Sequence, residues 1–299
     1  MKMIESILGA GVFMLSAHNV AAQSATPVTA PDDATEITIS YSTNGEKGAT
    51  ATSSSSGRNM LIERVIARRK DGVELEYDLQ PEAKPEERAR SWQLPARVIK
   101  GRDGRTRLVN RDQLETRLGN WLKAAQWDRS VCGRWIFTWN AFRIECDPDT
   151  VIAMIEGVDL AAQELRDGAS YLDPRSTGPV RVTRSRDTAK GAQFTATPTI
   201  DPAKVSNERA ETDVIMGELM RTPVSLETAL LERTKEQVSG TIMVTWDVDT
   251  AGMTWKRTRT TVLTIRSADD RVEKETRIDT IERHSRRIVS SPAMPDAEA

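Results

Sequence analysis

Hydrophobic and polar residues alternate with a period of two along most of the chain, which is the pattern of β-strands with one buried face. In residues 73–79, four hydrophobic residues alternate with three acidic ones, and the preceding Asp71-Gly72 is typical of a tight hairpin turn. The same pattern predicts strands at residues 36–42, 60–69, 73–79, 92–100, 105–109, 180–186 and 193–200. Residues 44–58 are polar and of low complexity, and we predict a loop there.

The last third of the chain predicts a three-stranded antiparallel meander over residues 241–248, 254–266 and 271–283. The middle segment departs from simple alternation in its first half. Arg257 and Arg259 on one face are opposed by Lys256 and Thr258 on the other, so both faces are polar. A strand of this kind is typical of an exposed sheet edge or of a strand that lines a groove.

The clearest helical pattern covers residues 111–125. Its apolar stripe consists of Leu114, Leu118, Trp121, Leu122 and Ala125. Asn110 is placed to cap this helix, with Gln113 at the reciprocal position of a capping box. Shorter helices are predicted at residues 150–156, 213–220 and 226–235.

These elements predict an α+β fold, mainly an antiparallel β-sheet with a few helices packed on one face. The chain divides into two β-rich halves, residues 35–173 and 178–289, which form either two lobes or one. Residues 290–299 are expected to be a disordered tail.

Aromatic residues are concentrated in one block. Six of the thirteen aromatic residues beyond position 22 fall within 22 positions. The simplest interpretation is that they form the core of the first half, where a helix packs on the sheet. The functional alternative is an apolar cleft for a lipid, glycan or peptide, because aromatic walls are usual in ligand pockets. The candidate cleft residues are Trp121, Trp135, Phe137, Trp139 and Phe142.

Residues 1–22 have the pattern of an export signal. Lys2 supplies a short basic region, residues 7–17 are uncharged, and Val20-Ala21-Ala22 places small residues at a cleavage site. The alternative is an uncleaved N-terminal anchor. No later segment approaches the ~18 apolar residues of a spanning helix, so we expect a periplasmic or secreted protein without an integral membrane segment after cleavage. Residues 23–34 would form a flexible leader.

Export changes the interpretation of the only two cysteines, Cys132 and Cys146. Disulfides persist in exported proteins, and a disulfide between these residues would close a loop of moderate size. The alternative is free or reactive thiols. A catalytic thiol needs a basic partner to ionise it. The one histidine of the mature chain, His284, is 138 positions beyond Cys146, so no such partner is near in sequence.

Composition and motifs exclude several function classes. The chain carries 42 Lys+Arg against 44 Asp+Glu, so its bulk charge does not favour nucleic acid as a partner. No metal-ligand spacing, nucleophile elbow or phosphate-binding loop occurs, so we assign no metal, cofactor or catalytic residue.

No motif identifies a family. The sequence favours a non-enzymatic binding or envelope-maintenance protein with an apolar cleft. The alternative is a glycosidase-like envelope hydrolase, because two carboxylates can act together from any distance in the sequence.

Overall fold

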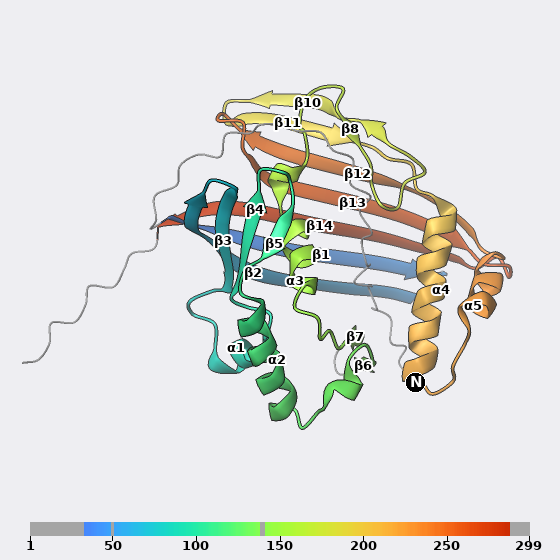
Figure 1. The fold of residues 1–299 in the computed structure, drawn as a ribbon. Coiled ribbons are helices and arrows are strands. Elements are labelled where there is room, and N and C mark those ends of the chain that lie inside the picture. Colours follow the sequence, from blue (N-terminus) through green and yellow to red (C-terminus); the bar gives the residue numbers. More distant parts are fainter. Residues whose placement is uncertain (1–32, 49–50, 138–140, 288–299) are drawn as a thin grey trace, which may run out of the picture.

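The computed structural model describes residues 33–48, 51–137 and 141–287 (Figure 1). The expected signal peptide (1–22), nearly all of the leader (23–34) and the C-terminal tail (290–299) lie outside the described residues.

A ten-stranded antiparallel sheet forms the body of the protein, with strand order β10-β11-β12-β13-β14-β1-β2-β3-β4-β5. Its strands are β1 (Asp33–Lys47), β2 (Ala51–Arg69), β3 (Gly72–Leu79), β4 (Ala96–Gly101), β5 (Thr106–Leu108), β10 (Thr183–Thr188), β11 (Gly191–Ala196), β12 (Gln237–Asp249), β13 (Thr254–Arg266) and β14 (Val272–Arg287). Two small hairpins add β6 (Trp135–Phe137) with β7 (Ala141–Arg143), and β8 (Ser170–Tyr171) with β9 (Val180–Arg181).

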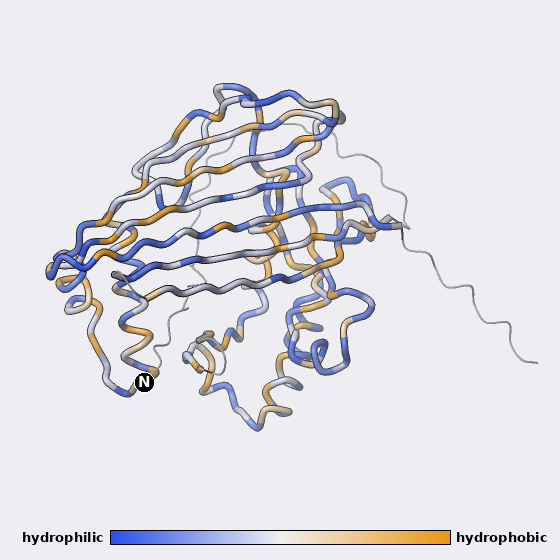
Figure 2. Tube along the Cα trace, turned by 180° about the vertical axis from the view of Figure 1, so that it is seen from behind, coloured by the Kyte–Doolittle hydropathy of each residue, from blue (hydrophilic) through white to orange (hydrophobic). Residues whose placement is uncertain are grey.

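The helices lie on one side of the curved sheet, here called the inner face (Figure 1). They are α1 (Pro85–Arg90), α2 (Arg111–Ala124), α3 (Thr150–Gly157), α4 (Pro202–Leu219) and α5 (Leu226–Arg233), with 3-10 turns η1 (Arg129–Val131) and η2 (Leu160–Ala162). Seen from behind, the strands form an outer face with no helix in front of it (Figure 2). The predicted α+β class, mainly antiparallel with helices on one face, is confirmed. Over the described residues, no helix combines the length and apolar character needed to cross a membrane.

The C-terminal meander is confirmed as β12, β13 and β14. β14 then pairs along its length with β1, which joins the two ends of the chain in the middle of the sheet. β13 therefore has a neighbour on each side, and the interpretation of its polar first half as a sheet edge is wrong. The other interpretation, a strand that lines a groove, stays a prediction.

The predicted loop at residues 44–58 is wrong for most of its length. β1 and β2 pair continuously from Ala34 opposite Arg64 to Lys47 opposite Ala51. Ladder hydrogen bonds join backbone groups, so they do not require apolar side chains. Serine and threonine hydroxyls on the outer face are solvated there, and their polarity does not end the strand.

Two separate apolar cores lie on the inner face. The first core lies between β1–β4 and helices α2 and α3, and contains Ile37, Leu75, Tyr77, Val98, Leu114, Leu118, Val151 and Ile155. The second core lies under β11 and β12, and contains Val182, Phe194, Ile200, Val205, Ile242, Val244 and Trp246. Each half of the sheet thus buries its own apolar surface, and β13 and β14 cross the region between them.

Helix α2 confirms the predicted apolar stripe, because Leu114, Leu118 and Leu122 are all buried in the first core. The predicted cap is wrong. Asn110 makes no side-chain cap hydrogen bond. Its Oδ1 instead accepts from the Arg97 backbone N–H at 2.8 Å, and its Nδ2 donates to the Pro95 carbonyl oxygen at 3.0 Å. The side chain therefore fastens the start of the helix to the start of β4.

Candidate ligand-binding face

The region between the two cores is lined by charged side chains. β13 and β14 pair directly here, with Arg257 opposite Ile281 and Arg259 opposite Asp279, so these side chains share the inner face. We call this set the charged band, and it consists of Glu63, Asp173, Arg257, Arg259, Arg277, Asp279 and Arg283. The band runs from Glu63, which binds Tyr77 of the first core, across β14 and β13 to Asp173 beside the second core.

Asp173 is the most deeply buried member of the band, with no exposed surface. The guanidinium of Arg259 donates to both of its carboxylate oxygens, at 2.8 and 3.0 Å. Tyr171 Oη donates to Asp173 Oδ2 at 3.2 Å, and the Arg175 backbone N–H donates to Oδ1 at 2.9 Å. Burial on its own would raise the pKa of Asp173, but the hydrogen bonds and charge of Arg259 outweigh it and hold that pKa below its usual range.

The other two carboxylates of the band are also neutralised. Glu63 accepts from Tyr77 Oη and from Arg283 Nη2, each at 2.5 Å. Asp279 accepts from Arg277 Nε at 2.9 Å. Burial, reinforced by the charge of Glu63, raises the pKa of Tyr77 well above its usual value, so its hydroxyl stays a donor.

Arg257 differs from the other three arginines. Among the ion pairs of the described residues, none involves Arg257. Its hydrogen bond runs from Nη2 to the Gly157 carbonyl oxygen at the end of α3, at 3.2 Å. Burial lowers the pKa of Arg257, and the charges of Asp279 and Asp173 oppose this effect only in part. Arg257 is therefore the one arginine of the band that makes no ion pair among the described residues.

The aromatic residues predicted to line a cleft lie in two places. Trp121 packs against the first core and meets Trp127 edge-to-face, with ring centroids 5.6 Å apart. Trp135, Phe137 and Phe142 belong to the β6–β7 hairpin, and β6 lies next to α4. Trp139 lies outside the described residues.

The rings of the β6–β7 hairpin are less buried than core residues. Phe137 is 43% and Phe142 40% exposed, and among the described residues the first core does not include Trp135, Phe137 or Phe142. The structure therefore places Phe137 and Phe142 at the surface, outside the first core where the simplest interpretation of the aromatic block put them. Whether these rings bind a ligand stays a prediction.

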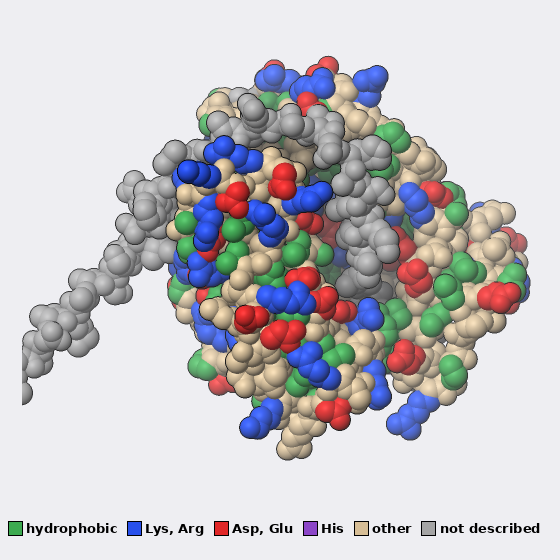
Figure 3. Space-filling model, viewed as in Figure 1, with side chains coloured by type: hydrophobic (Ala, Val, Ile, Leu, Met, Phe, Trp, Pro, Cys, Tyr) green, Lys and Arg blue, Asp and Glu red, His purple; other side chains and the backbone are tan. Residues whose placement is uncertain are grey.

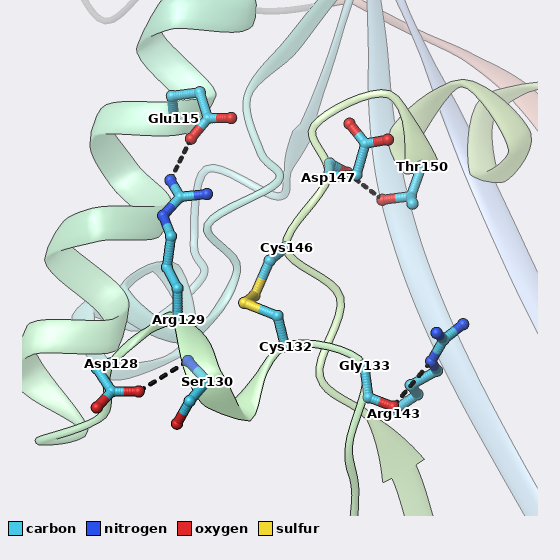
Figure 4. The surroundings of a disulfide bond; sticks show 10 residues. All are labelled: Glu115, Asp128, Arg129, Ser130, Cys132, Gly133, Arg143, Cys146, Asp147 and Thr150. Carbon is cyan, nitrogen blue, oxygen red and sulfur yellow. Dashed lines mark hydrogen bonds and ion pairs between the residues drawn. A yellow bond between two sulfur atoms is a disulfide. The ribbon is translucent and has the colours of Figure 1, made fainter.

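The predicted disulfide is confirmed, and it closes the base of this hairpin (Figure 4). The Cα atoms of Cys132 and Cys146 are 5.6 Å apart, and neither cysteine is free. Backbone hydrogen bonds from Gly133 N–H to the Ile144 carbonyl and from Ile144 N–H to the Arg134 carbonyl continue the ladder above it. The disulfide thus fixes the position of the hairpin that carries the exposed rings of Phe137 and Phe142.

The α4–α5 hairpin carries a separate surface pocket of about 350 Å³. Its apolar lining includes Met216, Met220, Val224 and Ala229, and Met220 is 68% exposed. Figure 3 shows hydrophobic side chains at the surface of this hairpin.

One carboxylate stands out on chemical grounds. Several described carboxyl groups have a pKa that departs clearly from its usual value, and Glu275 of β14 is the one among them whose pKa is raised. The cause is burial, opposed by the charge of Arg175 and reinforced by that of Glu273. It faces the same side of the sheet as the band, opposite Leu263 and Gly45.

No protein-family model matches the chain, and no curated protein matches it in sequence. Among solved structures, that of lipovitellin, described for its lipid–protein interactions, is similar to the chain with a TM-score of 0.39 and 10% sequence identity. The match covers 89% of this chain and 26% of that chain, so this protein spans about a quarter of the length of lipovitellin.

Sequence reasoning found part of this face. The polar first half of β13 drew attention to Arg257 and Arg259, because buried strands rarely carry charges. Glu63 and Asp173 had no such signal, since they lie in unrelated segments and reach the band only through the fold.

Proposed function

We propose that this protein is an exported binding protein that holds its ligand on the inner face of the sheet, at the charged band. The observation that carries the proposal is the charged lining between two apolar cores. Buried ion pairs give no more stability than well-packed apolar residues of the same size. A sheet that served only as a scaffold would have joined its two cores with apolar side chains, so the charges favour recognition of a ligand.

The ligand we propose has a polar part and an apolar part. The band supplies hydrogen-bond donors and charges for the polar part. The exposed rings of Phe137 and Phe142 supply apolar contact surface on the hairpin beside α4. This retains the sequence-based hypothesis of an apolar cleft and adds a polar anchor to it.

Native mass spectrometry of the protein purified without detergent tests the proposal. We expect a co-purified small molecule that is lost after denaturation and refolding. Phe137→Ser with Phe142→Ser should reduce its occupancy. Met243→Ser, which removes an equally exposed apolar side chain from β12, is the matched control. Ligand-free wild-type protein that also binds no member of a lipid, glycan and peptide panel would refute a binding role.

Export is proposed on the sequence of residues 1–22 and is supported by the disulfide, because such bonds persist in oxidising compartments. The intact mass of the protein from envelope or medium fractions should lack 22 residues, with Gln23 at the N-terminus. A full-length cytoplasmic protein with reduced cysteines would contradict it.

A hydrolase that uses carboxylates is the second candidate, and Glu275 is the observation in its favour. A carboxyl group with a raised pKa can act as a general acid near neutral pH. If this is the activity, Glu275→Gln should abolish hydrolysis of a glycan panel, while Glu282→Gln, on the outer face of the same strand, should not. Absence of hydrolysis by wild-type protein would remove this candidate.

A further inference from the structure

Arg257 is the one arginine of the charged band that makes no ion pair among the described residues. Arg257 lies between Trp246 of β12 and Ile281 of β14, its direct cross-strand neighbours. Trp246 is 1% exposed and stacks edge-to-face on Tyr171, with centroids 4.9 Å apart. Arg257 thus has apolar neighbours in the ladder, and the carboxylates near it, Asp173 and Asp279, make their ion pairs with other arginines.

The contacts of Arg257 leave most of its donors available. A guanidinium has five N–H donors in a planar fork. One of them is used by the Gly157 carbonyl at 3.2 Å. The nearby carboxylates Asp173 and Asp279 are bound by Arg259 and Arg277. The Arg257 side chain is half-buried and has no ion pair among the described residues, so an anion of the ligand can bind its remaining donors directly.

We propose that Arg257 binds the acidic group of the ligand, a carboxylate or a phosphate, by a two-pronged contact. The inference rests on the proposed binding function and specifies its ligand class as an anionic amphiphile. Planar oxyanions match the guanidinium fork, which makes such contacts strong and directional. The half-buried position of the side chain strengthens the attraction relative to a fully solvated pair.

A purely structural role is the competing explanation. Arg257 could serve only to cap the C-terminus of α3, since basic side chains bind the last carbonyls of helices favourably. The two explanations differ in what removal of the charge does. Loss of a cap weakens folding and leaves binding unchanged, whereas loss of an anion receptor weakens binding of acidic ligands selectively.

The test is isothermal titration calorimetry of the full mature protein, stripped of co-purified ligand, with decanoate, decyl phosphate, decanol and inorganic phosphate. We expect wild type to bind at least one acidic amphiphile at least tenfold more tightly than decanol. Arg257→Gln should abolish that preference, and Arg257→Lys should reduce it. Arg266→Gln is the control, because Arg266 lies on the same strand but is exposed. Inorganic phosphate that binds as tightly as decyl phosphate would identify a free anion as the source of the acidic group.

The results separate this inference from the proposed function. If wild type binds decanol and the acidic probes equally, or if Arg257→Gln keeps the preference, the anion site is refuted while the binding function stands. If wild type carries a ligand in native mass spectrometry but binds no acidic probe, the anion site is also refuted. Thermal unfolding is measured on every variant, and Arg257→Gln should be no less stable than wild type. A destabilised variant with unchanged preference would establish the cap instead.

Discussion

Asp173 offers the sharpest test of how the charged band is held together. The substitution Asp173→Asn keeps the shape of the side chain and removes its charge. It leaves the Arg259 guanidinium, whose side chain is only 20% exposed, without the carboxylate that accepts two of its hydrogen bonds. Asparagine also offers one acceptor oxygen where the carboxylate accepts from Arg259, Tyr171 and the Arg175 backbone.

The expected cost follows from this geometry. Removing one partner of a buried ion pair typically costs about 3–5 kcal/mol, because the remaining charge stays buried and unpaired. Asparagine keeps part of the hydrogen bonding, and Asp279 Oδ2 stays 3.9 Å from Arg259 Nη1, so we expect the free energy of unfolding at pH 7 to fall by about 3 kcal/mol, the lower end of that range. Arg259→Met in the Asp173→Asn background should restore part of the loss, because the unpaired charge is then removed.

The pH dependence of the free energy of unfolding gives a second, independent test of the role of Asp173. The pKa of Asp173 is lowered in the folded state, so its charge stabilises the fold above the unfolded-state pKa of about 3.9. That contribution is lost as the pH falls through the folded-state pKa. Equilibrium urea unfolding at pH 7 and at lower pH should therefore show a difference between wild type and Asp173→Asn that shrinks below about pH 4.

Asp187 provides the matched control. It also pairs with an arginine, Arg184, but their side chains are 72% and 54% exposed. Asp187→Asn should change the free energy of unfolding by less than about 1 kcal/mol. If Asp173→Asn is as mild as Asp187→Asn, or if its effect does not decline in acid, the band is not a buried ionic network and the argument from it fails.

Three other substitutions test separate parts of the structure, each by equilibrium urea unfolding. Cys132→Ala with Cys146→Ala should cost about 3 kcal/mol, the value for a loop of this size, and thiol labelling of denatured, unreduced wild type should find no free cysteine. Glu275→Gln should be more stable than wild type at pH 7, because a raised pKa in the folded state means that ionisation of Glu275 opposes folding. This gain in the free energy of unfolding should vanish below about pH 4, where the carboxyl group is protonated in both states. A less stable variant at pH 7 would contradict the raised pKa of Glu275. Trp246→Ala should cost about 3–5 kcal/mol, and a cost no larger than that of Trp255→Ala, whose side chain is 36% exposed, would refute its place in the second core.

Periodic patterns of apolar residues predicted the helices and strands whose formation depends on neighbours in the sequence. The stripe of Leu114, Leu118 and Leu122 identified helix α2, and alternation over most of its length identified the meander. Asn110 shows the limit of this reasoning. Its residue type is right for a cap, but its amide is satisfied by Pro95 and by Arg97 of β4, which are its neighbours only in the folded chain.

The candidate site was harder to predict than the fold. The aromatic block was conspicuous in sequence, yet the structure places Trp121 in the first core and the β6–β7 rings beside α4. The band was visible only as an unexplained pair, Arg257 and Arg259. Its carboxylates come from positions 86 and 220 residues away from the arginines that they bind, a separation at which sequence spacing carries no information.

The arrangement of the sheet explains how such a lining is tolerated. β14 pairs with β1 over fifteen register positions and with β13 over eleven, so the middle strands are held by backbone hydrogen bonds along their whole length. Apolar burial is supplied on either side, by the first and second cores. The side chains of β13 and β14 between the cores can therefore be polar without loss of the apolar burial that holds the sheet. The same independence of the ladder from side-chain polarity allows the serine- and threonine-rich end of β2 to be a strand, and it predicts that substitutions at Arg257 change binding while leaving the sheet intact.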